Sequence, residues 1–530
     1  PKEKVANRLS RFKFTDSLHF ASEVNMLEVN TQRDECCHSG GSVEFGPDGL
    51  LYLSTGDDTN PFASDGFAPI DERPGRKAWD AQRSSANTND LRGKILRIKP
   101  EADGSYSIPE GNLFAEGTEN TRPEIYTMGL RNPFRISIDP KRNWLYWGDV
   151  GPDAGETDSL RGPKGIDEIN QARKAGNYGW PYFRGDTYVY NDYNFATKEH
   201  GEKFNPDKPI NTSPNNTGLD ELPPFQRPMI WYGYDESEEF PWVFTGGKNP
   251  MAGPIYYSDM YPDAKSAFPD YFDGTLLFYE WMRNWIYVVH LDEEGHFAKA
   301  DPFMPSTKFS RPMDMVFGPD GSLYMLEYGQ KWFARNMDAR LSKIEYIKGN
   351  RAPIARILAS QEVGGVPLTV EFSASASEDF DGDALTYEWK FPTETMKGET
   401  VSYTFEEAGQ FWVELEVEDP TGASATAKKM IQVGNDVPTI AWSIDKGNQT
   451  FFWDDASFDY SVEVMDKEDG SLSEGDIQPD WVTVSINYLP EGEDITEIAQ
   501  GHQMNTGAVA TGSGEFATGK KLIDESDCKA

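Results

Sequence analysis

The chain of 530 residues has few cysteines, little positive charge and no long hydrophobic run. No apolar stretch approaches the roughly 20 residues that cross a bilayer, so we expect no transmembrane segment in this chain. Its 88 Asp and Glu residues outnumber its 50 Lys and Arg residues, giving a formal charge of −38. This charge argues against nucleic acid as a partner, because polyphosphate binds to basic surfaces. The three cysteines, Cys36, Cys37 and Cys528, are too few for a disulfide framework.

Turn-forming and aromatic residues are abundant. The chain has 48 Gly, 35 Pro and 13% aromatic residues. This composition is typical of many short strands joined by tight turns, because helices exclude both turn formers. An all-β architecture is therefore predicted. The length exceeds that of one ordinary core, and at about 150 residues per domain we expect three domains.

One pattern, a turn that leads into an apolar strand, recurs along the chain. Its copies are FGPDGLLYLSTGD at 45–57, SIDPKRNWLYWGDVG at 137–151 and VFGPDGSLYMLEYG at 316–329. Their turn prolines are separated by 93 and 179 residues, close to two and four propeller blades of about 45 residues. We expect the insertions at 60–90 and 185–250 to be long loops rather than further strands. The sequence therefore predicts a six-bladed β-propeller over residues 1–348.

Two small β-sandwich modules are predicted to follow the propeller. Residues 351–434 contain alternating apolar strands, the acidic turn DFDGD and the Ala408-Gly409 turn. Such alternation buries one face of each strand, and the segment resembles a PKD domain, an immunoglobulin-like β-sandwich. Residues 436–503 repeat the pattern of short alternating strands. The DFDGD turn has the oxygen spacing of a calcium loop but lacks its closing Glu, so a solvated acidic turn is favoured.

Five short sequence blocks carry the strongest functional signal. In chain order they are Cys36-Cys37-His38-Ser39-Gly40-Gly41, Gly129-Leu130-Arg131-Asn132-Pro133, Gly151-Pro152, Asp167-Glu168-Ile169-Asn170 and Gly176-Asn177-Tyr178-Gly179-Trp180-Pro181. Their order and neighbours resemble those of the soluble glucose/sorbosone dehydrogenases, which use pyrroloquinoline quinone (PQQ). The resemblance extends over roughly residues 5 to 345. It implies a PQQ- and calcium-dependent oxidoreductase that acts on an aldose or a related alcohol group.

Oxidation of a sugar hydroxyl requires a base that accepts its proton while hydride leaves the adjacent carbon. A histidine suits this role, because its pKa lies near the working pH. The resemblance implies that His38 is the base and that Asp57 orients it through a hydrogen bond. The structural alternatives are a loop histidine and an aspartate that caps its own turn.

The resemblance also implies which residues would hold the quinone. Arg131 and Asn132 would meet the quinone oxygens, with Arg131 supplying positive charge where the reduced cofactor becomes anionic. The alternative for Arg131 is a structural arginine between strands. Where the family places cations for the carboxylates of the cofactor, this chain has a methionine beside Arg283 and another two residues after Arg311. Arg283 and Arg311 are the expected substitutes.

A calcium site is implied at Gly151, Pro152 and Asp167. The family binds calcium through the backbone carbonyls of the Gly-Pro pair, and hard oxygen ligands suit this ion. The ion would polarise the quinone carbonyl as a Lewis acid. The segment DAGETDSLRGPKGI interrupts the family pattern between Pro152 and Asp167. This insertion could cover the pocket or displace the metal.

The cysteines allow two further predictions. Cys36 and Cys37 are either two buried small side chains or a vicinal disulfide beside the base. Cys528-Lys529-Ala530 would begin a C-x-x-C-H haem motif, and the preceding FATGKKLIDESD resembles the first helix of class I c-type cytochromes. Residues 504–530 are therefore predicted to be a linker and the start of a cytochrome domain, with haem c bound beyond residue 530.

Together these features predict a sugar dehydrogenase that passes electrons to a c-type cytochrome fused to it. Haem attachment and PQQ chemistry both occur outside the cytoplasm, so we expect the periplasm or cell surface of a Gram-negative bacterium. Residues 1–14 are typical of a strand inside a blade, so the first blade is expected to be incomplete and an export signal to precede it. The alternatives are a non-catalytic propeller and PKD protein that binds glycans or proteins, and a propeller lactonase. For the lactonase no carboxylate cluster is recognisable.

Overall fold

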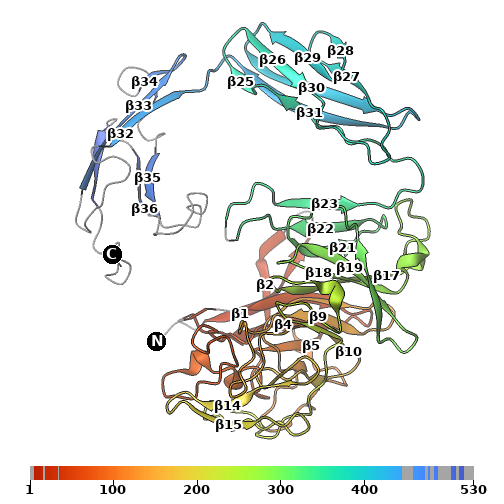
Figure 1. The fold of residues 1–530 in the computed structure, drawn as a ribbon, viewed down its shortest axis with the longest axis vertical. Helices are drawn as coiled ribbons and strands as arrows, with labels where there is room; N and C mark the ends of the chain where they lie inside the picture. Colours follow the sequence, from red (N-terminus) through yellow and green to blue (C-terminus); the bar gives the residue numbers. More distant parts are fainter. Residues whose placement is uncertain are drawn as a thin grey trace. The chain divides into compact units, whose positions relative to one another are not determined.

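The computed structural model describes residues 5–15, 18–33, 35–36, 38–332, 334–444, 457–471, 476–477, 483–487, 503–508 and 513–517. Cys37 and residues 518–530, on which the vicinal disulfide and the cytochrome predictions depend, lie outside these ranges. The described residues form strands, turns and short 3-10 helices without an α-helix, which confirms the all-β prediction (Figure 1). No helix in these ranges is long and apolar enough to cross a membrane. The chain divides into two compact units, 1–332 with 336–346, and 347–530 with 333–335.

The described part of the first unit is built mainly from four sheets, preceded by the hairpin of β1 (Ala6–Phe14) and β2 (Leu18–Asn30). The first sheet contains β3 (Gly40–Phe45), β4 (Leu51–Thr55), β5 (Lys94–Pro100), β6 (Tyr106–Ser107), β7 (Ile125–Met128) and β11 (Gly176–Asn177). The second contains β8 (Pro133–Ile138), β9 (Leu145–Asp149), β10 (Asp167–Ala172) and β16 (Ile230–Tyr232). The third contains β17 (Pro250–Tyr256), β18 (Thr275–Glu280), β19 (Trp285–Leu291) and β20 (Phe297–Phe303). The fourth contains β21 (Pro312–Phe317), β22 (Leu323–Glu327) and β23 (Arg340–Ile344).

The first strands of successive sheets lie side by side. Strand β3 contacts β8, β8 contacts β17, and β17 contacts β21. This is the order in which propeller blades pack against one another. Each copy of the recurrent turn pattern joins the first and second strands of a sheet, namely β3–β4, β8–β9 and β21–β22. The number of six blades remains a prediction.

The two insertions differ from one another. Residues 60–90 contain the short helices η1 (Lys77–Trp79) and η2 (Ala81–Arg83) and no named strand, as expected of a long loop. The prediction for 185–250 is wrong in part, because β16 pairs with β10 as the outer strand of the second sheet. The same region, with the two residues before it, holds the hairpins of β12 (Phe183–Arg184) with β13 (Tyr188–Val189) and of β14 (Asn191–Asn194) with β15 (Glu199–Lys203), and η3 (Pro241–Val243). The β17–β18 connection lacks the recurrent turn and holds η4 (Ser258–Met260) and η5 (Asp270–Phe272).

The sheets of the first unit pack tightly on both faces. Strand β18, with sequence TLLFYE, is buried at every position, because neighbouring sheets cover both of its faces. Where β9 meets β17, a Cβ atom at Gly148 would lie 2.0 Å from the carbonyl oxygen of Pro250. Glycine is therefore required for this close approach of two sheets.

The second unit begins with a two-sheet sandwich. One sheet contains β24 (Leu358–Ala359), β26 (Leu368–Ser373) and β29 (Thr400–Phe405). The other contains β25 (Val363–Gly364), β27 (Thr386–Lys390), β28 (Thr395–Lys397), β30 (Gly409–Glu418) and β31 (Ser424–Val433). Phe372, Trp389 and Leu415 fill the space between the sheets and are fully buried. This core agrees with the predicted immunoglobulin-like sandwich.

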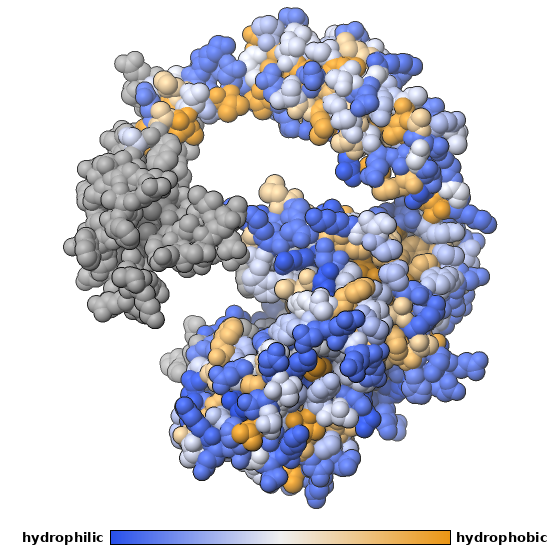
Figure 2. All heavy atoms as spheres, viewed as in Figure 1, coloured by the Kyte–Doolittle hydropathy of each residue, from blue (hydrophilic) through white to orange (hydrophobic). Residues whose placement is uncertain are grey.

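The described strands after residue 436 pair with one another. They are β32 (Thr439–Ile444), β33 (Ser457–Asp466), β34 (Gly470–Ser471) and β37 (Ser513–Ala517) in one sheet, and β35 (Thr483–Asn487) with β36 (Gln503–Ala508) in another. Over the face shown in Figure 2, hydrophilic side chains predominate on the first unit, in keeping with the formal charge of −38.

Candidate functional site

His38 lies just before β3 and is held in an uncommon conformation. Its φ angle is +60°, in the left-handed region, and its carbonyl oxygen accepts a hydrogen bond from the Asp58 amide at 3.2 Å. A Cβ atom at Gly56 would lie 2.1 Å from this carbonyl oxygen, so glycine at the end of β4 makes room for the histidine backbone. The imidazole is 10% exposed. The ring is thus fixed at one end of the first sheet and still reaches the surface.

Asp57 orients the imidazole of His38. The Nδ1 atom of His38 lies 2.7 Å from Oδ1 of Asp57, whose side chain is fully buried. The other carboxylate oxygen accepts from Nε1 of Trp180 at 2.8 Å, and the Thr59 amide donates to Oδ1 at 3.0 Å. An ionised carboxylate can only accept, so Nδ1 carries the proton and Nε2 is left as an acceptor. Asp57 therefore both caps its own turn and positions a base.

Arg131 and Asn132 lie beside this pair. The Asp57 amide donates to the Arg131 carbonyl at 2.8 Å, and the Gly40 amide donates to Oδ1 of Asn132 at 3.3 Å. The Arg131 side chain is 4% exposed and donates to the Val150 carbonyl and to Asp153. These two bonds leave further N–H groups of the guanidinium for a ligand. The structure thus brings His38, Asp57, Arg131 and Asn132 together.

In three of the four sheets the second strand ends at a buried carboxylate, and in the first sheet a buried carboxylate follows β4 by two residues. These residues are Asp57, Asp149, Glu280 and Glu327. In three sheets the carboxylate accepts from the backbone amide of a residue just before the first strand, namely Asn132, Asn249 or Ser310. In the first sheet the His38 side chain takes this place. Sequence reasoning missed the repeat, although an acidic residue follows each apolar strand in STGD, YWGD, LFYE and YMLE.

Two of the oxygens predicted to bind calcium instead contact a lysine that sequence reasoning missed. Nζ of Lys248 lies 3.0 Å from the Pro152 carbonyl oxygen and 2.9 Å from Oδ1 of Asp167. Oδ1 of Asp167 also accepts from the Gly151 amide, while Oδ2 is buried without a hydrogen-bond partner among the described residues. Calcium takes about six to eight oxygen ligands. The arrangement at Gly151, Pro152 and Asp167 does not fit this ion, because an ammonium group already holds two of these oxygens.

A buried ion cluster holds the ends of β9 and β10 next to this lysine. Arg184 is fully buried and binds Asp149 at 2.7 Å and Glu168 at 3.1 Å. Burial raises the pKa of Glu168 to about 7; Arg184 opposes this shift, and the charge of Asp149 adds to it. Removal of the carboxylate from water disfavours its charged form, which explains the direction of the shift. The cluster is a structural anchor.

The two arginines predicted to replace the cationic residues of the family differ in availability. The Arg283 guanidinium donates to five backbone carbonyls, those of Gly233, Val243, Phe244, Gly246 and Gly247. A guanidinium has five N–H groups, so Arg283 has none left for a ligand and fastens the loop between β16 and β17. Arg311 stacks on Trp281, with its guanidinium carbon 4.4 Å from the ring centre. Arg283 is thus committed to the fold, whereas the Arg311 guanidinium donates no hydrogen bond within the part of the chain that the structure describes.

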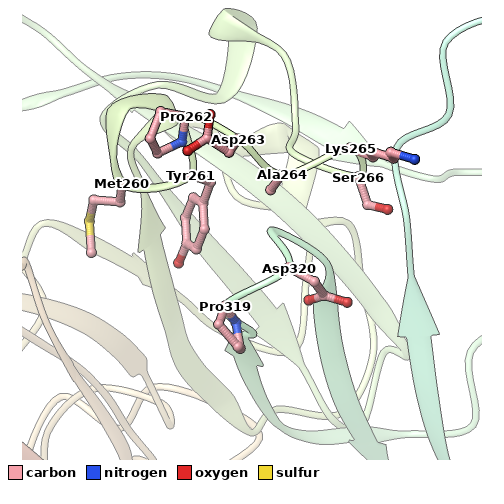
Figure 3. A pocket seen from close by; sticks show the side chains of 9 residues that line it. All are labelled: Met260, Tyr261, Pro262, Asp263, Ala264, Lys265, Ser266, Pro319 and Asp320. Atoms are coloured by element: carbon pink, nitrogen blue, oxygen red, sulfur yellow. The ribbon is translucent and has the colours of Figure 1, made fainter.

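One cavity is lined in part by sequence neighbours of His38. It measures about 560 Å³ and is lined by residues that include Cys36, Ser39 and Asp58. Cys36 is disulfide-bonded. Burial raises the pKa of Asp58, although Arg92 at 2.8 Å opposes the shift. A second cavity, of about 520 Å³, lies between the loop 260–266 and the turn at Pro319 and Asp320, and contains none of the predicted site residues (Figure 3).

The acidic turn of the sandwich is more organised than its sequence indicated. Asp379 and Asp383 converge with Asp419, and one carboxylate oxygen of each lies within 4.8 Å of the others. Asp379 also accepts from the backbone amides of Asp381 and Asp383. These hydrogen bonds within the turn account for its tight geometry.

Comparison with known proteins identifies two domains. Residues 1–219 match the glucose/sorbosone dehydrogenase family, and residues 350–433 match the PKD domain family. The chain therefore contains a glucose/sorbosone dehydrogenase domain and a PKD domain. The resemblance to the glucose/sorbosone dehydrogenases is thereby confirmed for residues 1–219 and the resemblance to the PKD domain for residues 350–433, whereas the cytochrome domain remains a prediction.

Several curated proteins are similar to the chain. HIPL2 protein of Arabidopsis thaliana is 28% identical over 350 residues, which are 62% of this chain and 41% of that protein. Quinoprotein glucose dehydrogenase B of Acinetobacter calcoaceticus is 26% identical over 344 residues, 62% of this chain and 65% of that protein. The chain thus spans less than two thirds of either relative. Among solved structures, the PQQ-bound aldose sugar dehydrogenase of Streptomyces coelicolor aligns with 64% of this chain and 71% of its own, at 18% identity and a TM-score of 0.38.

Proposed function

We propose that the first unit is a PQQ-dependent oxidoreductase that oxidises an alcohol group of a sugar. The observation that carries the proposal is the imidazole of His38, held through Nδ1 by the fully buried Asp57 with Nε2 left as an acceptor. The glucose/sorbosone dehydrogenase domain over residues 1–219 supports the reaction class and the substrate class. Similarity to quinoprotein glucose dehydrogenase B supports the cofactor.

The residues around His38 can perform the proton transfer that this reaction needs. Nε2 accepts the proton of the sugar hydroxyl, and the imidazolium that forms is stabilised by Asp57. When bound, PQQ would accept the hydride from the adjacent carbon. Arg131 then directs its remaining N–H groups at the negative charge that develops. Trp180 keeps Asp57 in place through its hydrogen bond to Oδ2.

The test is dye-linked oxidation of a panel of sugars by the purified chain supplied with PQQ. We expect dye reduction with at least one sugar. His38→Ala should lower the rate by about 100-fold or more, as expected for loss of a general base, while PQQ affinity is kept. The matched control is His296→Ala, because this imidazole is 69% exposed and its ion pair is with the surface residue Asp292. Absence of quinone binding and of dye reduction, with a glucose dehydrogenase active in the same assay, would exclude the proposal.

A second candidate function is a binding protein for glycans or proteins without turnover. The saturation of Arg283 by backbone carbonyls favours it, because a cation expected to hold the carboxylates of the cofactor is occupied. Calorimetric titration of the quinone-free chain with the same sugars separates the two functions. Sugar binding without dye reduction supports the binding protein.

A location outside the cytoplasm is part of the proposal. Cys36 is disulfide-bonded, and disulfides persist mainly in oxidising compartments. The high negative charge is compatible with a secreted or periplasmic protein, and no described helix could span a bilayer.

A further inference from the structure

Lys248 is a buried cation that takes no part in the proposed proton transfer. Its side chain is 2% exposed, and its Nζ contacts the Pro152 carbonyl oxygen at 3.0 Å and Asp167 at 2.9 Å. Nζ also lies 4.3 Å from the ring centre of Tyr234. A carbonyl, a carboxylate and an aromatic face therefore surround the ammonium, which compensates for its removal from water.

The backbone around Lys248 is shaped for this contact. A Cβ atom at Gly165 would lie 1.9 Å from the Pro152 carbonyl oxygen and 2.9 Å from Nζ of Lys248. A Cβ atom at Gly151 would lie 1.8 Å from the Ile166 carbonyl oxygen. Glycine at both positions lets the residues just before the insertion and the last residues of the insertion close around the ammonium. The backbone at the end of the insertion therefore leaves room for the lysine side chain.

Lys248 and Arg131 are linked through the side chains of Asp153 and Tyr234. Asp153 accepts from Arg131 at 3.4 Å and from the Tyr234 hydroxyl at 3.3 Å. Tyr234 in turn covers Lys248, and the Asp153 side chain is 58% exposed. Asp153 therefore contacts one cation directly and is linked to the other through Tyr234, and Arg131 lies next to the residues that orient His38.

We propose that Lys248 is the built-in cation of the sugar-oxidising site and takes the place of calcium at Pro152 and Asp167. The inference rests on the proposed function. Two oxygens that would bind the metal already accept from the ammonium, whose charge repels a second cation at this distance. The site then holds two fixed positive charges, those of Lys248 and Arg131, without a metal ion.

The first experiment measures PQQ affinity in the presence of EGTA and in millimolar calcium. For the wild-type chain we expect the two values to agree within about twofold. Lys248→Met should bind PQQ at least about tenfold more weakly in EGTA, and calcium should restore the affinity. An increase of tenfold or more in wild-type affinity on addition of calcium would overturn the inference.

The second experiment needs neither quinone nor sugar, so its result stands even if the proposed function fails. Calorimetric titration should show one more bound calcium for Lys248→Met than for the wild-type chain. Lys164→Met is the matched control, since this partly exposed lysine pairs with Asp235 outside the site. The acidic turn at Asp379 is unchanged in all three proteins, so the difference reports on the lysine site. No additional calcium in Lys248→Met would contradict the inference.

A third measurement uses the wild-type chain and so does not depend on folding of the variant. Lysine acylation read by mass spectrometry should leave Lys248 unmodified with and without calcium, while Lys164 is modified in both. If calcium exposed Lys248 to the reagent, the metal would be displacing the ammonium and the inference would be wrong.

Discussion

At the scale of single residues, the hydrogen bond between Asp57 and His38 decides which imidazole nitrogen can accept a proton. The substitution Asp57→Asn keeps the shape of the side chain but replaces one carboxylate oxygen by an NH2 group. With Trp180 still donating to the amide oxygen, the amide nitrogen would donate to Nδ1 and move the ring proton to Nε2. We expect kcat to fall by about 100-fold or more, with PQQ affinity unchanged.

The measurement is dye-linked kcat across pH for Asp57→Asn and for Asp259→Asn, an exposed aspartate that pairs with Lys141. If Asp57→Asn kept the full rate, the carboxylate would not have the role assigned to it here.

Glu168 gives a prediction about pH. Burial raises its pKa to about 7 from an ordinary value of 4.5, so between these values the folded state binds more protons than the unfolded state. The contribution of Glu168 to the free energy of unfolding is therefore present below about pH 4.5 and is lost as the pH rises to about 7. Glu168→Gln should remove this loss. Urea unfolding of the first unit at pH 5 and 7.5 tests it, and an equal pH dependence in the variant would speak against the shifted pKa.

At the scale of elements, Arg283 fastens the loop between β16 and β17 through five carbonyls. Arg283→Met keeps part of the aliphatic stem but leaves these oxygens without their donor. We expect faster proteolysis within residues 233–247 and a lower Tm, because buried acceptors lose their partners. Arg227→Met, at a 67% exposed side chain, is the control. Unchanged cleavage would show that the loop is held by other contacts.

The elements that the sequence predicted are those defined by local chemistry. The Pro-Asp-Gly turns and apolar strands at 45–57 and 316–329 are recognisable because each is specified by adjacent residues. The short strand β16 was missed, because Ile230–Tyr232 becomes a strand only by pairing with β10. Pairing between distant segments has no local signature.

The same limit applies to the candidate site. His38 and Asp57 were found because the blocks around them resemble a known family, and the structure places the two side chains in contact. Lys248 was missed, because it lies 96 residues from Pro152 in the chain and its role arises only from folding. The hydrogen bonds of Arg283 to backbone carbonyls could not be predicted from the sequence either, since its partners come from a loop without regular structure.

At the scale of the whole molecule, the two compact units have separate cores. Phe372, Trp389 and Leu415 pack within the sandwich alone. A fragment of residues 347–434 should therefore fold by itself, with a β-type circular dichroism spectrum and one cooperative thermal transition. The same transition should appear in the full chain. A fragment that shows no cooperative unfolding would mean that the sandwich depends on the rest of the chain.

The buried carboxylates at the ends of the second strands have a consequence for how this site could have arisen. Asp149, Glu280 and Glu327 stabilise the fold by binding backbone amides, and Asp57 uses the same position to bind an imidazole. Activity commonly costs stability, because catalytic groups are usually held in unfavourable surroundings. Here a single histidine before β3 would turn a stabilising carboxylate into the partner of a base. The chemistry thus uses a carboxylate position that the fold already supplies, and the corresponding ends of the other sheets are natural places to engineer a second base.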